Sequence, residues 1–274
     1  MPQTSLPADY HTHTPLCLHA EGEPEGYIDR AIERGVTEYG ISDHAPQIPE
    51  PFDDWRMLEG KLPEYFDWMD RARKHAGDEL VVRAGMECDW LPGNKSWLED
   101  LAGRYDWDYL IGSIHYLGGS GESWDFDNPV WLGRWAETDV DQVWNNYWQE
   151  YATMARSGLF DFLGHPDLIK KFGYKPAGEL KRYYIPAIEA IAESNTAIEL
   201  NMAGLHKPCK EAYPSMEFLT LAAEANIPIT LSSDAHAPAE VGQNFEQGIE
   251  LLKEAGYTST CLFEKRIRKQ RPLI

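Results

Sequence analysis

Short apolar runs alternate along the chain with longer segments in which apolar residues recur at helical spacing. The runs are rich in Val, Ile, Leu and Tyr, which is typical of buried strands, and the longer segments favour helices. We predict strands over residues 8–13, 36–44, 79–88, 107–116, 159–165, 196–202 and 227–234. A further run, residues 259–263, predicts an additional edge strand.

Helical periodicity is clear over residues 26–35, 140–158 and 215–226, and each segment ends on Gly or Asn as helices often do. Strand and helix alternate without an internal repeat, a linker or a change of composition. This alternation predicts an α/β fold, a parallel barrel with its helices outside, in one domain over residues 1–274. Two long loops rich in Trp and Pro, residues 46–55 and 118–135, are expected to cover one face of the barrel.

Composition narrows the classes of partner. The chain of 274 residues has a formal net charge of −20, so its surface repels polyanions and no nucleic-acid partner is expected. An anionic substrate would need bound cations or clustered basic side chains in its pocket. No apolar stretch approaches the length of a membrane span, and the four scattered cysteines fit neither a zinc ribbon nor a disulfide scaffold. We therefore expect a cytoplasmic protein without a membrane partner, either a monomer or a homo-oligomer.

Histidines and carboxylates gather where the predicted strands end. Seven of the nine histidines lie at a strand end or in the loop directly after it, the exceptions being His75 and His206. Barrel enzymes carry their chemistry at the carboxyl ends of the strands, so these side chains are expected to converge on one rim. The candidate ligands are His11, His13, His19, His44, Glu87, His115, His165, Asp234 and His236. Only the sixth strand, which ends at Asn201, lacks an obvious ligand.

A metal site explains this convergence best. In the pair His11 and His13, the intervening residue places both imidazoles on the same side of an extended strand. Imidazole and carboxylate ligands suit Zn, Mn or Fe, and no thiolate is expected near the set, which disfavours a structural zinc. A lone histidine is more often a hydrogen-bonded polar residue, and Glu87 alone fits a buried ion pair. Nine such side chains on one rim, however, would repel one another or stay unsatisfied without cations.

Six stretches resemble the PHP (polymerase and histidinol phosphatase) superfamily in type and order: HTHTPLCLH, SDHAP, GMECDW, GSIHYL, GHPDLIKKFG and SSDAH. Longer stretches, such as HPDLIKKFG and IELNMAGLHKPCKEAYPS, are similar to the monofunctional histidinol-phosphate phosphatases of histidine biosynthesis. The resemblance spans nearly the whole chain. It implies a distorted (β/α)7 TIM-like barrel of parallel strands with outer helices. It also implies hydrolysis of L-histidinol phosphate, a small phosphorylated metabolite, with three divalent metal ions.

The ligand pattern of the superfamily transfers position by position, and every position is filled. It implies one ion held by His11, His13, Glu87 and Asp234, a second held by His19, His44 and His236, and a third held by His115 and His165, with Glu87 shared between the first and the third. His19, in the loop after the first strand, gains its role from this pattern alone.

The expected reaction is in-line attack on phosphorus by a metal-activated hydroxide. Either Asp234 or His236 is expected to pass a proton to the leaving alcohol, and the sequence does not choose between them. Basic candidates for the phosphate follow the fifth and sixth strands, at Lys170, Lys171, His206 and Lys207. Each lysine is equally a candidate for a solvated surface residue. The motif GLHKP has histidine where similar proteins often have arginine, and imidazole lacks the bidentate fork of that side chain.

The cationic end of such a substrate would be bound by acidic or aromatic side chains in the loops. The candidates are Asp43, Asp89, Trp90, Trp124 and Asp127, and the sequence assigns none of them.

Three other functions fit part of the pattern. Another PHP phosphoesterase would act on a different small phosphate ester or on a phosphoprotein. An amidohydrolase-like barrel shares the HxH pair and a late aspartate, but the additional set of His19, His44 and His236 argues against it. A non-catalytic metal-binding PHP module would be expected to have lost ligand positions, whereas all nine are present here.

Overall fold

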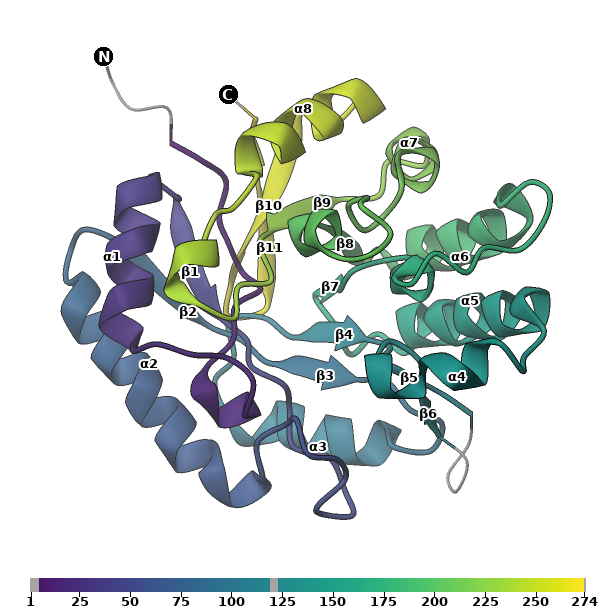
Figure 1. Cartoon of the computed structure of the whole chain (residues 1–274). Coiled ribbons are helices and arrows are strands. Elements are labelled where there is room, and N and C mark those ends of the chain that lie inside the picture. The colour runs from purple at the N-terminus through teal and green to yellow at the C-terminus, as the bar shows by residue number, and fades with distance from the viewer. Residues whose placement is uncertain (1–4, 119–122, 274) are drawn as a thin grey trace.

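Parallel strands form a closed ring in the computed structural model, which describes residues 5–118 and 123–273 (Figure 1). Five of them make one sheet in the order β3-β4-β7-β8-β9, and β1 pairs with β2 beside it. The strands are β1 (Glu38–Ile41), β2 (Val81–Ala84), β3 (Glu87–Asp89), β4 (Ile111–Ser113), β7 (Phe162–Leu163), β8 (Ala197–Asn201) and β9 (Ile229–Ser232). Every pairing among them is parallel, as the alternating pattern predicts.

The segment before β1 closes the ring, although only isolated bridges hold it. Asp9 pairs with Tyr39 on one side, and Thr12 pairs with Ala235, beyond β9, on the other. The backbone amide of Asp9 donates to β1, whereas that of His13 donates to Ala235, so the segment forms no continuous ladder with either neighbour. The first predicted strand therefore takes the place of a barrel strand without regular strand pairing. Because β2 and β3 together occupy one strand position, the ring has seven positions and is a distorted (β/α)7 barrel.

The predicted strand over residues 79–88 is divided into β2 and β3. At Gly85, between them, a Cβ atom would come within 2.2 Å of the ring of Tyr109, so only glycine fits there. The hydroxyl of Tyr65 donates to the freed carbonyl of Gly85 at 2.8 Å. Because of this break, β2 pairs with β1 whereas β3 pairs with β4.

Helices surround the strands on the outside (Figure 1). They are α1 (Pro24–Arg34), α2 (Leu62–Ala76), α3 (Lys95–Arg104), α4 (Leu132–Trp135), α5 (Val140–Arg156), α6 (Lys181–Ser194), α7 (Met216–Glu224) and α8 (Phe245–Ala255). The helices predicted from the sequence correspond to α1, α5 and α7. In the described part of the chain, no helix is long and apolar enough to cross a membrane.

A hairpin closes the amino-terminal end of the barrel. The predicted edge strand is β10 (Ser259–Glu264), and it pairs antiparallel with β11 (Ile267–Pro272), which the sequence pattern did not indicate. Phe263 of β10 packs against Tyr10, Tyr109 and Phe162, with ring centroids 5.3–6.2 Å apart. Among the described residues this aromatic cluster fills the amino-terminal end, and the pocket lies at the carboxyl ends of the strands.

The two long loops meet over the carboxyl end of the barrel. The short strand β5 (Tyr116–Leu117) lies just before the second loop and pairs with β6 (Trp124–Asp125) inside it. Residues 119–122 of the predicted loop lie outside the described residues. Trp55 of the first loop stacks on Tyr116 of β5, with ring centroids 5.9 Å apart and planes at 4°, and its Nε1 donates to Asp125 of the second loop at 3.2 Å. Trp55 also lines the pocket beneath them. The loops therefore form the pocket wall, as the sequence predicts.

Candidate metal centre

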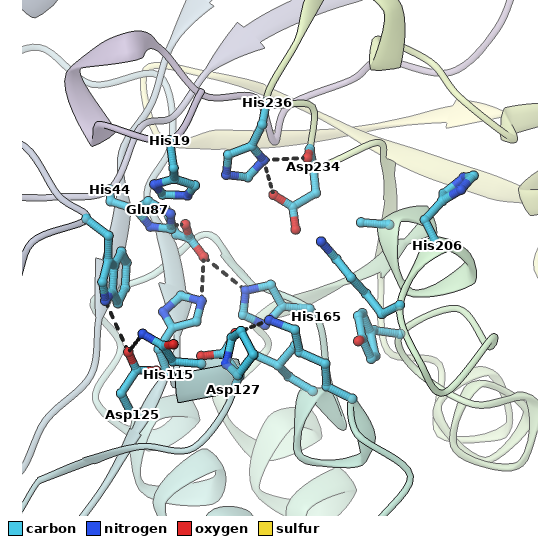
Figure 2. Close-up of a pocket in the computed structure, with 18 of the residues that line it drawn as sticks. His19, His44, Glu87, His115, Asp125, Asp127, His165, His206, Asp234 and His236 are labelled. Carbon is cyan, nitrogen blue, oxygen red and sulfur yellow. Dashed lines mark hydrogen bonds and ion pairs between the residues drawn. The ribbon is translucent and has the colours of Figure 1, made fainter. Parts of the chain in front are cut away.

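The strand-end side chains converge at the floor of a pocket of about 560 Å³ (Figure 2). Seven of the nine candidate ligands line it directly, and His11 and His13 join them through contacts with Glu87 and Asp234. Several groups of three offer ligand atoms within 4.8 Å of one another. The groups are His11, His13 and Asp234; His19, His44 and His236; His11, Glu87 and His165; and His13, His44 and Glu87.

Glu87 lies between the groups and contacts ligands on both sides. Its Oε2 atom is 2.7 Å from His44 Nδ1 and 3.3 Å from His11 Nε2. Its Oε1 atom is 3.0 Å from His165 Nε2 and 3.6 Å from His115 Nε2. Oε2 also lies 3.7 Å from His13 Nε2, and the carboxylate is almost fully buried, so its two oxygens face different sets of imidazoles. This geometry suits a carboxylate shared between two ions.

The histidines of the HxH pair do point to the same side. His13 Nε2 lies 3.0 Å and His11 Nε2 lies 3.7 Å from Asp234 Oδ1. Asp234 adopts a left-handed backbone conformation with φ of 56°, and His165 one with φ of 26°. Both are uncommon for residues with a side chain and are often found at functional sites.

His19 joins the group of His44 and His236 from outside the strands. A short 3-10 turn, residues 15–17, and the left-handed Leu18 reverse the chain, and His19 Nδ1 donates to the Cys17 carbonyl at 2.8 Å. His236 Nδ1 donates in the same way to the Asp234 carbonyl at 3.0 Å. Both hydrogen bonds leave Nε2 free, and the two rings lie 4.7 Å apart between centroids. The pair is therefore oriented as metal ligands usually are.

One thiol lies closer to the site than we expected. Cys17 offers its Sγ within 4.8 Å of ligand atoms of His13 and His236. Burial and the nearby Asp43 raise the pKa of the Cys17 thiol well above its ordinary value, so the protonated form is favoured. The expectation that no cysteine lies near the candidate ligands was therefore wrong. A buried, protonated thiol is nevertheless a poor metal ligand.

The residues present fit divalent cations. Four buried ligand atoms have no hydrogen-bond partner among the described residues: His11 Nε2, His44 Nδ1, Glu87 Oε2 and His165 Nδ1. His44 Nδ1 and Glu87 Oε2 approach to 2.7 Å without the geometry of a hydrogen bond. Two ligand atoms that each lie about 2.0–2.2 Å from the same ion are about 3 Å from each other. The short distance between His44 Nδ1 and Glu87 Oε2 is therefore typical of two ligands of one metal ion.

The carboxylates determine the electrostatics of the cluster. Burial lowers the pKa of His115, but Asp89 and Glu87 more than offset it and raise that pKa to about 10. In the same way, Asp234 and Asp43 outweigh burial and raise the pKa of His13 to about 9. Metal binding would therefore displace protons from these imidazoles.

A set of buried carboxylates orients the ligands from behind. Asp89 accepts from His115 Nδ1 at 2.7 Å, and Asp43 accepts from His13 Nδ1 at 3.4 Å. The sequence left these two carboxylates among the candidates for the cationic end of a substrate, but their positions behind the ligands exclude that role. Trp90 and Trp124 are buried in the core and do not line the pocket. Of those five candidates, only Asp127 lines it.

Glu199 is the orienting residue that the sequence did not identify. It is fully buried in β8, where its Oε1 accepts from His11 Nδ1 at 2.8 Å. Its Oε2 accepts from the backbone amide of His165 at 2.7 Å and from the side chain of Asn201 at 3.1 Å. The signal available was a glutamate inside the apolar run TAIELNM. Buried charges in such runs are paired or support a metal site.

Glu199→Gln is expected to weaken metal binding about 10- to 100-fold. The Gln amide oxygen will keep the two donors at Oε2, so its NH2 group will face His11 Nδ1 and favour the tautomer protonated on Nε2. That tautomer cannot bind a metal through the atom facing Glu87. Metal content after dialysis against graded metal buffers measures the effect. Glu224→Gln, an exposed glutamate on α7, is the matched control, and equal metal affinity of the two variants would contradict the orienting role.

The basic candidates for phosphate occupy different surroundings. Lys171, His206 and Lys207 line the pocket, with Lys171 Nζ donating to Asp127 at 2.8 Å. His206 and Lys207 are exposed at its rim. Lys170, by contrast, is fully buried and donates to Asp167 and to a backbone carbonyl, so its assignment as a phosphate candidate was wrong.

Comparison with known proteins agrees with this geometry. Residues 9–203 match the PHP domain family. The chain is 39% identical over 265 residues to a Deinococcus radiodurans protein named "Probable histidinol-phosphatase", covering 96% of this chain and 98% of that protein. A Bacillus subtilis protein named "Histidinol-phosphatase" is 25% identical, with 88% of this chain and 98% of that one covered.

A solved structure shares the fold. It is the histidinol phosphate phosphatase of Lactococcus lactis, crystallised with zinc, L-histidinol and phosphate. The two structures superpose with a TM-score of 0.78 over 96% of this chain and 98% of that one, and their sequences are 19% identical. This likeness agrees with the distorted barrel, and the family match covers most of the chain. The protein belongs to the PHP domain family.

Proposed function

We propose that this protein is a histidinol-phosphatase, a metal-dependent enzyme that hydrolyses L-histidinol phosphate to L-histidinol and phosphate in histidine biosynthesis. The observation that carries the proposal is the gathering of all nine ligand candidates at the floor of one pocket that also contains basic side chains. The names of the relatives from D. radiodurans and B. subtilis support the substrate. The small pocket and the net charge of −20 support a metabolite rather than a nucleic acid. We place the whole chain in one catalytic domain.

We assign three divalent ions to the centre. The first would be held by His11, His13, Glu87 and Asp234, the second by His19, His44 and His236, and the third by His115, His165 and Glu87. When bound, they would supply Lewis acidity, neutralising charge on the phosphoryl oxygens and acidifying water. Nitrogen and oxygen ligands suit Zn, Mn or Fe, and zinc is the ion in the L. lactis enzyme.

The protein's own side chains then position the ester and move its proton. Lys171 and Lys207 are assigned to the phosphate, with His206 at the rim. Asp234 and His236 have side chains 18% and 27% exposed on the pocket side of the cluster, so either can reach the leaving alcohol. Asp234 Oδ2 accepts from Asn201 at 3.0 Å, which holds its carboxylate in place. We assign the proton transfer to this pair.

Two other functions are weaker. A different PHP phosphoesterase would keep the same centre but differ on the pocket wall. A non-catalytic metal-binding module would not need basic side chains in the pocket, nor eight of the nine candidate ligands in potential metal-binding groups with the ninth, His115, lining the same pocket. A cytoplasmic location fits the four cysteines, none of which forms a disulfide among the described residues.

Purified protein loaded with Zn, Mn or Fe is expected to hydrolyse L-histidinol phosphate with a kcat/KM at least about 100-fold above that for 4-nitrophenyl phosphate, because only the natural ester uses the pocket wall. Phosphate release measures both rates, and the chelated enzyme is the control. A kcat/KM for histidinol phosphate no higher than for the aryl ester would exclude this substrate. Preference for another phosphorylated metabolite in the same assay would favour the first alternative.

A further inference from the structure

Two carboxylates face the pocket on the wall formed by the second long loop. Asp125 ends β6 and Asp127 follows two residues later, and both line the pocket. Figure 2 shows them on the side of His115, away from Asp234 and His236. Neither belongs to a group of potential metal ligands in the described residues. They are therefore separate from the metal centre. Asp127 remains a candidate for the cationic end of a substrate, and Asp125 has no role in the chemistry above.

Asp125 is buried with half of its carboxylate unsatisfied. The residue is 6% exposed, and its Oδ2 accepts from Trp55 Nε1 at 3.2 Å and from Asn128 Nδ2 at 3.0 Å. Its Oδ1 is buried and has no hydrogen-bond partner among the described residues. Burying a carboxylate oxygen without a hydrogen-bond donor is unfavourable in free energy. A bound proton or a cationic ligand would relieve this.

One lysine side chain pairs with these two carboxylates among the described residues. Lys171 Nζ donates to Asp127 Oδ2 at 2.8 Å, which compensates one of the two carboxylates. Burial and the neighbouring Asp127 raise the pKa of Asp125 to about 7. Burial opposes ionisation of Asp127 too, but Lys171 and His115 hold its pKa below the ordinary value. Without a ligand, the two carboxylates share a proton, and an arriving cation would replace it.

We propose that Asp125 and Asp127 form the subsite that receives a cationic amino group on the alcohol portion of the phosphate ester. This inference rests on the proposed phosphatase function and specifies the substrate class: a small phosphate monoester that carries an ammonium group. The ester phosphate lies at the metal centre, and the ammonium donates to Asp125 Oδ1 and to the free lone pairs of Asp127. L-Histidinol phosphate belongs to this class.

The test compares two esters of similar size that differ in charge, phosphoethanolamine and propyl phosphate, together with histidinol phosphate. In the wild-type holoenzyme, the kcat/KM for phosphoethanolamine is expected to exceed that for propyl phosphate. Asp125→Asn and Asp127→Asn are each expected to lower this ratio about 30-fold, mainly through KM, because a partly buried charge pair loses one partner. Since both rates come from the same preparation, partial unfolding or loss of metal cancels in the ratio.

The control variant is Asp78→Asn, which removes an exposed carboxylate that does not line the pocket, and its ratio is expected to equal that of the wild type. If the two pocket variants also keep the wild-type ratio, the carboxylates only share a proton and the subsite is wrong. If the wild type prefers the amine but turns over histidinol phosphate no faster than phosphoethanolamine, the subsite stands and the histidinol assignment fails.

Discussion

Glu87→Gln is expected to lower kcat for histidinol phosphate at least about 1000-fold, a loss of about 4 kcal/mol of transition-state stabilisation. Both oxygens of Glu87 contact imidazoles, His44 and His11 on one side and His165 and His115 on the other. An amide keeps only one oxygen able to bind a metal and places an NH2 group against imidazoles on the other side. The variant would therefore lose the ligand that we propose two ions share, while the volume of the side chain stays the same.

Steady-state phosphate release and metal analysis of the same preparation measure this effect together. The expected result is a lower metal content with a much lower kcat, because the ions neutralise the charge that develops on phosphate. Glu79→Gln, an exposed glutamate in the same predicted strand, is the matched control and is expected to behave as the wild type. A Glu87→Gln enzyme with full metal content and near-normal kcat would show that Glu87 is only a buried hydrogen-bonding residue.

Sequence alone could predict which side chains gather at one rim, because in a barrel the order of strands along the chain determines their positions in space. The carboxyl ends of parallel strands meet at one rim, so strand-end residues such as His115 and His165 had to be neighbours. The same regularity placed the long loops over the pocket. His19 was the exception, since it lies in no strand, and only the resemblance to the PHP superfamily indicated its role.

The supporting residues could not be predicted in this way. Glu199 contacts His11 across 188 residues of sequence, and no spacing rule joins the middle of one strand to a ligand on another. The division of β2 from β3 depends on the ring of Tyr109 passing Gly85, which is a packing event rather than a local preference. Similarly, the unsatisfied oxygen of Asp125 depends on how two loops meet. Contacts of this kind require the three-dimensional structure.

His19→Ala is expected to reduce the metal content by one ion and to lower kcat at least about 100-fold. His19 joins His44 and His236 in a group without a carboxylate, so removing one imidazole leaves two ligands, too few to hold an ion firmly. The side chain is exposed, and its loss is expected to change the free energy of unfolding of the metal-free protein little. Metal analysis of protein purified without oxygen is the decisive measurement, because it also preserves Fe.

The control variant is His75→Ala, which removes an exposed histidine of α2 that contacts Asp29 and does not line the pocket. This variant is expected to keep the metal content and the activity of the wild type. If His19→Ala binds as much metal as the wild type, this group is not a metal site, and the centre would resemble a two-metal barrel built on the HxH pair alone.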